Sequence, residues 1–192
     1  MSPHLWWYVA RAGGLVAWVL AGLSITLGLL LSGRLAVRPR PAWQQDLHRY
    51  LGALAVGLLG LHLLGLVLDP VVEFGPASLA LPMASAWRPG AVTWGVGAAY
   101  ALLLVELSSL AMRRIPRRLW RGIHVLSFVV WIAGSVHAVT AGTDGTAVRI
   151  IAAGGSAVIV NLTLLRVVGR RVPRARPAGR PATATRIAST PR

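Results

Sequence analysis

The sequence predicts an all-α protein, a polytopic transmembrane bundle of five helices. Two observations carry this prediction: 55% of the 192 residues are hydrophobic, and the mean hydropathy is +0.63. A soluble domain of this length does not bury so large an apolar share in its core. The apolar residues also form long runs between short charged stretches, which is typical of a chain that has the bilayer as its solvent.

Five runs are long enough to cross a hydrocarbon layer of about 30 Å, which takes about 20 apolar residues in a helix. They cover residues 5–31, 46–68, 91–112, 119–139 and 147–168. The first run has no basic segment before it and no clear cleavage site, so we expect a retained helix rather than a signal peptide. Residues 69–90 hold four prolines and are expected to form a loop over the outer membrane face.

The domain organisation follows from composition. Residues 1–168 hold all five spans and form one predicted transmembrane domain. After them, residues 169–192 are rich in Arg, Pro, Ala and Thr and almost free of large apolar side chains. Such a segment cannot bury enough surface to fold, and we expect a disordered, basic cytoplasmic tail.

Arginine supplies all the basic residues other than histidine, and its distribution predicts the orientation. Most arginines fall on one side of the expected bundle: Arg34, Arg38, Arg40, Arg49, Arg113, Arg114, Arg117, Arg118, Arg121 and those from Arg166 onward. By the positive-inside rule this side is cytoplasmic, which places the N-terminus outside and the C-terminus inside. Because the arginines flank spans instead of covering one water-exposed face, the net charge of +15 does not indicate nucleic-acid binding.

The chain contains no cysteine. This excludes disulfides, iron–sulfur clusters and thiolate metal sites. Any redox chemistry must therefore use histidine, aromatic side chains or a bound cofactor.

Four of the five histidines lie in two of the expected spans, and ionisable groups inside a membrane indicate function. His48 and His62 belong to the second span, and His124 and His137 to the fourth. One span separates these two helices, so they run in the same direction, with His48 and His124 near the cytoplasmic face and the other two near the outer face. The spacings of 14 and 13 residues correspond to about 21 and about 20 Å. Two facing helices supply both axial ligands of a haem at each level, which predicts two bis-histidine haem b sites.

The helical phase of these ligands differs between the two spans. At about 100° per residue, His48 and His62 share a face, whereas His124 and His137 lie about 140° apart. The fourth helix is therefore expected to tilt, to distort near Gly134, or to present its ligands from different edges. Glycines lie one turn from three ligands: Gly52, Gly65 and Gly134. They indicate either room for a flat macrocycle or close packing of helices.

Four further residues are candidates for supporting roles, and His4 stays unassigned. Arg49 and Arg121 adjoin the inner histidines and are expected to bind haem propionates, although the positive-inside rule alone also explains them. Trp131 is midway in depth between the two levels and is expected to assist electron passage, with a core or lipid-facing position as the alternative. Glu106, the only acid deep in a span, is expected to be protonated or paired.

The spacings H-x13-H at His48 and His62 and H-x12-H at His124 and His137 resemble the ferric reductase-like transmembrane domain. This family includes NADPH oxidases, yeast-type ferric reductases and the haem-binding membrane subunit of the bacterial methionine sulfoxide reductase system. Residues 7–18 and 82–89 also resemble short actinobacterial members, and the likeness covers residues 5–168. It implies an inner haem on His48 and His124, an outer haem on His62 and His137, and a location in a bacterial cell membrane. The best-known relatives have six spans rather than five.

The resemblance and the topology together predict a diheme cytochrome, the electron-transfer membrane component of an oxidoreductase. It would pass electrons outward to an extracytoplasmic acceptor. The flavin and nicotinamide domains of the NADPH oxidases have no room in the short tail, so the expected donor is a cytoplasmic flavoprotein or quinol. Two alternatives stay open: a single-haem protein with a quinone or flavin at the other level, and a haem-free scaffold or transporter whose histidines bind neighbouring helices.

Overall fold

The computed structural model describes residues 4–32, 41–72, 74–142 and 145–171, and within these ranges all regular structure is helical. The helices are α1 (Leu5–Ser32), α2 (Ala42–Leu68), α3 (Pro76–Ala80), α4 (Pro89–Leu110), α5 (Arg117–Val125), α6 (Ser127–Ala141) and α7 (Gly145–Arg171). Five helical segments are long and apolar enough to cross a membrane: α1, α2, α4, α7, and α5 together with α6. The predicted all-α class and the five predicted spans are confirmed.

The helix ends differ from the expected span ends by about one turn or less, and prolines account for several starts. Pro41 precedes α2, Pro89 is the first residue of α4, and Pro116 precedes α5. Proline suits these positions because its φ is already helical and its missing N–H is not needed in a first turn. At the other end, α7 continues to Arg171. The rest of the expected tail, residues 172–192, lies outside the described residues, as do Arg34, Arg38 and Arg40.

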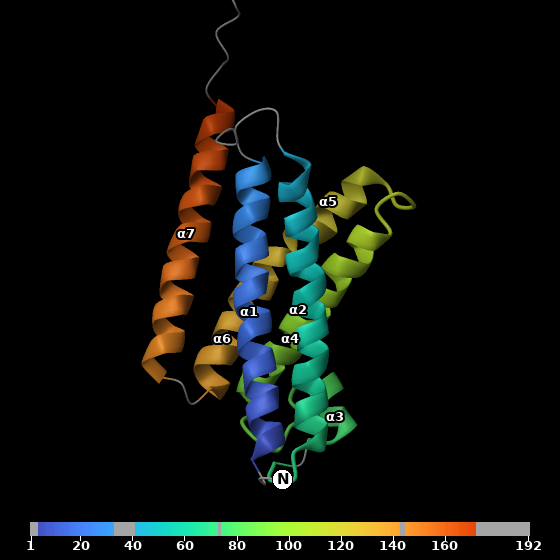
Figure 1. Cartoon of the computed structure of the whole chain (residues 1–192), viewed down its shortest axis with the longest axis vertical. Helices are drawn as coiled ribbons and strands as arrows, with labels where there is room; N and C mark the ends of the chain where they lie inside the picture. Colours follow the sequence, from blue (N-terminus) through green and yellow to red (C-terminus); the bar gives the residue numbers. More distant parts are fainter. Residues whose placement is uncertain (1–3, 33–40, 73, 143–144, 172–192) are drawn as a thin grey trace, which may run out of the picture.

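The bundle is built from two helix pairs and a flanking helix (Figure 1). α1 packs along α2, and α4 packs along α6, while α1 also contacts α6 and α7. One core cluster joins Trp18 of α1 to Trp131 of α6 and Ile159 of α7. Many large apolar side chains, such as Leu110 at 82% exposure, face outward. This arrangement suits a lipid environment, where an apolar surface needs no cover.

The fourth span is interrupted at Leu126, two residues after His124. The N–H of Leu126 donates to the carbonyl of Ile123 at 2.9 Å, a bond to the third rather than the fourth preceding residue. Each residue in such a tight turn rotates by about 120° instead of about 100°, which removes part of the angular offset between His124 and His137. The distortion expected near Gly134 therefore lies at Leu126 instead.

The segment between α2 and α4 forms the expected loop and contains the short helix α3. Asp69 accepts hydrogen bonds from the backbone N–H groups of Val71 and Val72 at its start. Further along, Phe74 is buried against Val92 of α4. Near its end, the Nη1 of Arg88 donates to the carbonyl of Thr140 in α6 at 2.7 Å. The loop is thereby fixed to the end of the bundle where His62 and His137 lie.

Candidate cofactor site

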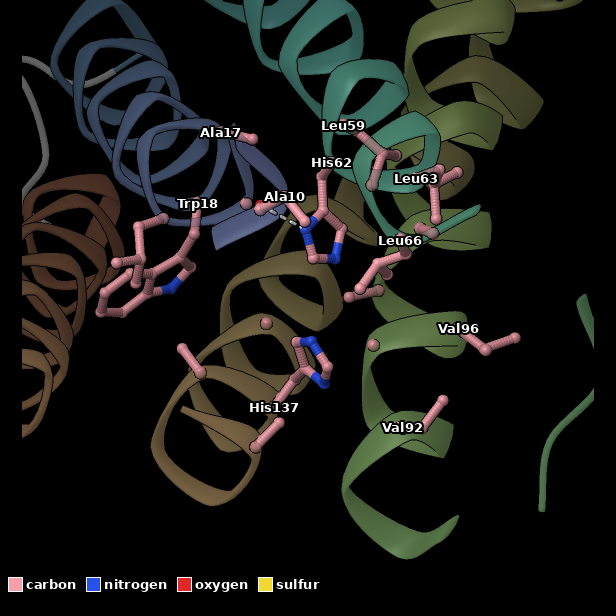
Figure 2. Close-up of a pocket in the computed structure, with 18 of the residues that line it drawn as sticks. Ala10, Ala17, Trp18, Leu59, His62, Leu63, Leu66, Val92, Val96 and His137 are labelled. Carbon is pink, nitrogen blue, oxygen red and sulfur yellow. Dashed lines mark hydrogen bonds between the residues drawn. The ribbon is translucent and has the colours of Figure 1, made fainter. Parts of the chain in front are cut away.

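The four membrane histidines form two pairs. The imidazole of His48 in α2 lies beside that of His124 in α5, with ring centroids 6.1 Å apart and planes at 67°. His62 in α2 and His137 in α6 have centroids 6.3 Å apart and planes at 75°. Figure 2 shows the second pair, with the two rings pointing toward one another from their helices. The pairing of side chains is the predicted one, whereas their role as iron ligands stays a prediction.

These separations suit one metal atom between each pair of rings. An imidazole nitrogen binds a transition metal at about 2 Å and the ring centre lies about 1 Å further on, so two such rings on opposite sides have centres about 6 Å apart. Among the described residues no group of three or more His, Cys, Asp or Glu side chains is arranged to hold a metal ion. Two protein donors at each level match a macrocycle that brings its own equatorial nitrogens.

Three of the four imidazoles are oriented by a backbone carbonyl of the neighbouring helix. The Nδ1–H of His62 donates to the carbonyl of Ala10 at 2.6 Å, that of His137 to Ala91 at 2.8 Å, and that of His48 to Ser24 at 2.9 Å. A carbonyl only accepts, so Nδ1 carries the proton and Nε2 keeps its lone pair on the other side of the ring. Metal-bound histidines are commonly held in this way.

A glycine lies four residues after each of these carbonyls. We call Gly14, Gly28 and Gly95 the glycine seats, because an imidazole lies over each of them. A Cβ at Gly14 would stand 2.8 Å from His62 Nδ1, and one at Gly95 would stand 2.7 Å from His137 Nδ1. At Gly28 the nearest atom would be His48 Cε1, at 3.1 Å. The missing side chain lets each imidazole reach the carbonyl one turn earlier.

The glycines one turn from the ligands on their own helices have other neighbours. A Cβ at Gly65 would meet the backbone of Ala10, and one at Gly134 would meet the Trp18 ring. These two positions favour close helix packing over room for a macrocycle. A Cβ at Gly52 would overlap the carboxyl group of Glu106, so this acid lies against α2 one turn from His48.

His124 differs from the other three ligand candidates, because its Nδ1 is buried without a hydrogen-bond partner in the described part of the chain. On α1 the carbonyl and glycine positions repeat after 14 residues. The same step along α4 leads from Gly95 to Ser109 and from Ala91 to Val105. The carbonyl of Val105 already accepts from the hydroxyls of Ser108 and Ser109, at 2.9 and 2.8 Å. The fourth position therefore has neither a glycine nor an uncommitted carbonyl.

A cavity of about 190 Å³ adjoins His62 and His137. Its lining is mainly apolar, as Figure 2 shows for Leu59, Leu66 and Val96. The loop before α4 contributes aromatic side chains to the lining, and α1 contributes Arg11 and Trp18: the loop residues are Phe74 and Trp87. A shape of this kind beside two imidazoles suits a flat, apolar cofactor with polar groups at one edge. Arg11 was missed by the sequence reasoning, which had treated the outer arginines only as a count for orientation.

The two arginines expected near the inner pair are exposed, and Arg49 lies 3.9 Å from Asp46 in an ion pair on the surface of α2. His4 is exposed at the start of α1, away from both pairs. The expected roles of Arg49, Arg121 and Trp131 stay predictions.

Trp131 is 5% exposed, and its ring stacks on Trp18, with centroids 5.2 Å apart and planes at 15°. Its Nε1 donates to Ser156 of α7 at 3.0 Å. The indole therefore faces α1 and α7, and it adjoins the outer cavity through Trp18, which sequence reasoning missed.

Comparison with known proteins gives one match. Residues 14–135 match the family described as ferric reductase like transmembrane component. No curated protein and no solved structure matches the chain. The matched range includes three of the four paired histidines and all three glycine seats, and it ends two residues before His137. The chain belongs to the ferric reductase-like transmembrane family.

Proposed function

We propose that this protein is a diheme b-type membrane cytochrome that carries electrons across the membrane. Family membership indicates a membrane electron-transfer component. The observation that supports two haems is the presence of two histidine pairs, one at each level, with nearly equal centroid separations of 6.1 and 6.3 Å. A bound haem supplies an iron that takes up and releases one electron. The chain supplies the axial imidazoles, fixes their tautomer and surrounds the site with apolar side chains.

The haem-free scaffold explains less of the geometry. A histidine that only joins two helices needs one ring nitrogen, and Nδ1 already makes that bond at His48, His62 and His137. In the described part of the chain these rings make no hydrogen bond through Nε2. Two facing imidazoles would then leave their lone pairs unused in an apolar bundle, which is unfavourable.

The second candidate is a single haem on His62 and His137, with a quinone or flavin at the inner level. The observation in its favour is the inequality of the two levels, since His124 lacks the carbonyl partner of the other three. Equal ring separations at both levels favour two haems.

The direction of transfer is part of the same proposal. The pair His48 and His124 lies at the end of the bundle that carries Arg113, Arg114 and Arg117. This end is cytoplasmic by the positive-inside rule. A cytoplasmic flavoprotein or quinol then reduces the inner site, and an extracytoplasmic acceptor takes the electron at the outer site. The protein resides in a bacterial cell membrane in this proposal.

A haem count tests the proposal most directly. The full chain is purified in detergent from cells supplied with a haem precursor, and haem per chain is measured from the pyridine haemochrome and the reduced-minus-oxidised spectrum. Two haems per chain with b-type bands are expected. One haem would support the single-haem candidate, and none would support the scaffold.

The basic residues beside the inner pair give a further prediction. Arg49→Gln combined with Arg121→Gln is expected to weaken binding of the inner haem by about tenfold, because each arginine would otherwise bind a propionate carboxylate. Arg113→Gln with Arg114→Gln is the control for charge alone. Haem affinities and midpoint potentials unchanged from the wild type would leave only the positive-inside role.

Trp131 is expected to assist passage between the haems. Its ring and that of Trp18 form a stacked, polarisable pair that reaches from the α7 side to the outer cavity. Trp131→Leu should keep both haems and slow the step from inner to outer haem several-fold in a rapid-reduction measurement. The control is Trp94→Leu, which changes a half-exposed tryptophan of α4. An unchanged rate would contradict the relay, and loss of haem would identify a packing role.

A further inference from the structure

Two buried polar atoms of side chains lack a hydrogen-bond partner in the described part of the chain, and both lie on α5. They are Nε1 of Trp120 and Nδ1 of His124. The two residues are one helical turn apart, and their ring centroids are separated by 5.0 Å with planes at 30°. Trp120 is the one nearer the arginine-rich end of the helix.

The indole of Trp120 is an exception among the buried tryptophans. Nε1 of Trp18 donates to Ser135 Oγ at 3.1 Å, and Nε1 of Trp131 donates to Ser156 Oγ at 3.0 Å. An indole N–H is a donor only, and burying it without an acceptor is unfavourable. The position therefore requires an acceptor oxygen that the described residues do not supply.

The surroundings of Trp120 favour an anionic acceptor. Arg117 lies three residues before it and Arg121 directly after it, and both are exposed at the same end of α5. An ionised oxygen gives a stronger hydrogen bond than a neutral one and is stabilised by nearby guanidinium groups. A carboxylate matches this combination of one buried N–H donor and adjacent positive charge.

We infer that the Trp120 indole N–H is a carboxylate-binding group that anchors a propionate of the haem held by His48 and His124. The inference rests on the proposed function and adds a positioning residue to its inner site. The haem is the closest source of a carboxylate, because the ring of Trp120 contacts the imidazole of His124. A carboxylate at this edge would also orient the macrocycle with its polar side toward the arginine-rich end.

Trp120→Phe tests the inference, because it keeps an aromatic ring and removes the N–H donor. The purified, haem-loaded full chain is mixed with excess apomyoglobin, and transfer of haem is followed by absorbance. We expect one haem per chain to leave about tenfold faster than in the wild type, the effect of losing one charge-assisted hydrogen bond, while the other haem stays. Trp43→Phe is the matched control, since Trp43 is 60% exposed near the start of α2. Equal rates for Trp120→Phe and wild type would overturn the inference.

Haem with both propionates esterified identifies the source of the acceptor. The wild type and Trp120→Phe are expected to lose this haem at equal rates, because the ester leaves no carboxylate for the indole to bind. A difference that persists with the ester would overturn the assignment to haem and point to an acceptor on a lipid, a quinone or a partner protein. A wild type that holds no inner haem would contradict the proposed function instead.

A second variant covers misfolding. If Trp120→Phe loses both haems, Trp120→Tyr replaces it, since a phenol keeps a ring and a polar hydrogen. The native haem should then leave Trp120→Tyr more slowly than the ester does. Equal rates for the native haem and the ester in this variant would overturn the inference.

Discussion

Replacing His62 and His137 together by alanine is expected to remove one haem per chain and to leave the other in place. The two imidazoles face each other with centroids 6.3 Å apart beside an apolar cavity, and nothing in this arrangement involves the pair at the other level. Loss of both axial ligands removes the bonds that hold the iron. The reduced-minus-oxidised spectrum should keep b-type bands at about half of the wild-type amplitude, with one midpoint potential instead of two.

The complementary variants make this result specific. His48→Ala with His124→Ala is expected to remove the other haem, and the quadruple variant to bind none. His4→Ala is the control, because His4 is exposed and far from both pairs in the fold. A quadruple variant with a full haem complement would contradict the ligand assignment, and its helical circular dichroism would show whether the bundle still forms.

Much of the architecture was predictable because bilayer physics acts on local sequence. A run of about 20 apolar residues is visible without any tertiary information, and parity along the chain fixes which spans run in parallel. This reasoning placed His48 level with His124, and His62 level with His137. Their proximity needed no knowledge of side-chain contacts.

The features that were missed depend on contacts between helices. Nothing local distinguishes Gly95, over which an imidazole lies, from Gly97 two residues later, where an added Cβ would have no neighbouring atom within 4 Å. The break at Leu126 was sought at Gly134, because glycine is a known cause of distortion, whereas leucine is not. A retrospective signal did exist: Gly14 and Gly28 are 14 residues apart, as are His48 and His62.

The repeat of 14 residues on α1 matches that on α2, and this explains why one helix pair serves both levels. Each histidine of α2 finds the same local backbone on α1, a carbonyl followed four residues later by glycine. The partner pair, α4 with α5 and α6, repeats this arrangement only at the outer level. The inner level then has one carbonyl-bound imidazole rather than two. Since a hydrogen bond at Nδ1 raises the basicity of the ligand, the two haems are expected to differ in midpoint potential.

Gly95→Ala is expected to weaken binding of the outer haem by about 10- to 100-fold, the range seen when the outer-shell partner of a metal-bound histidine is lost. The new Cβ would lie 2.7 Å from Nδ1 of His137 and 2.8 Å from Cε1, too close for any carbon atom. The imidazole must move away from α4 and give up its 2.8 Å bond to the carbonyl of Ala91. Its Nε2 then no longer faces His62 at the separation that suits an iron atom.

Gly97→Ala is the matched control, on the same helix and two residues away. A Cβ there meets nothing within 4 Å, and alanine favours a helix over glycine by about 1 kcal/mol. This variant should keep both haems and unfold at the wild-type temperature or slightly above it. Haem titration of the two variants separates the effects, since helix propensity predicts the same gain for both, whereas the contact with His137 predicts loss of the outer haem for Gly95→Ala alone. Equal haem affinity in the two variants would show that the glycine seat has no part in holding His137.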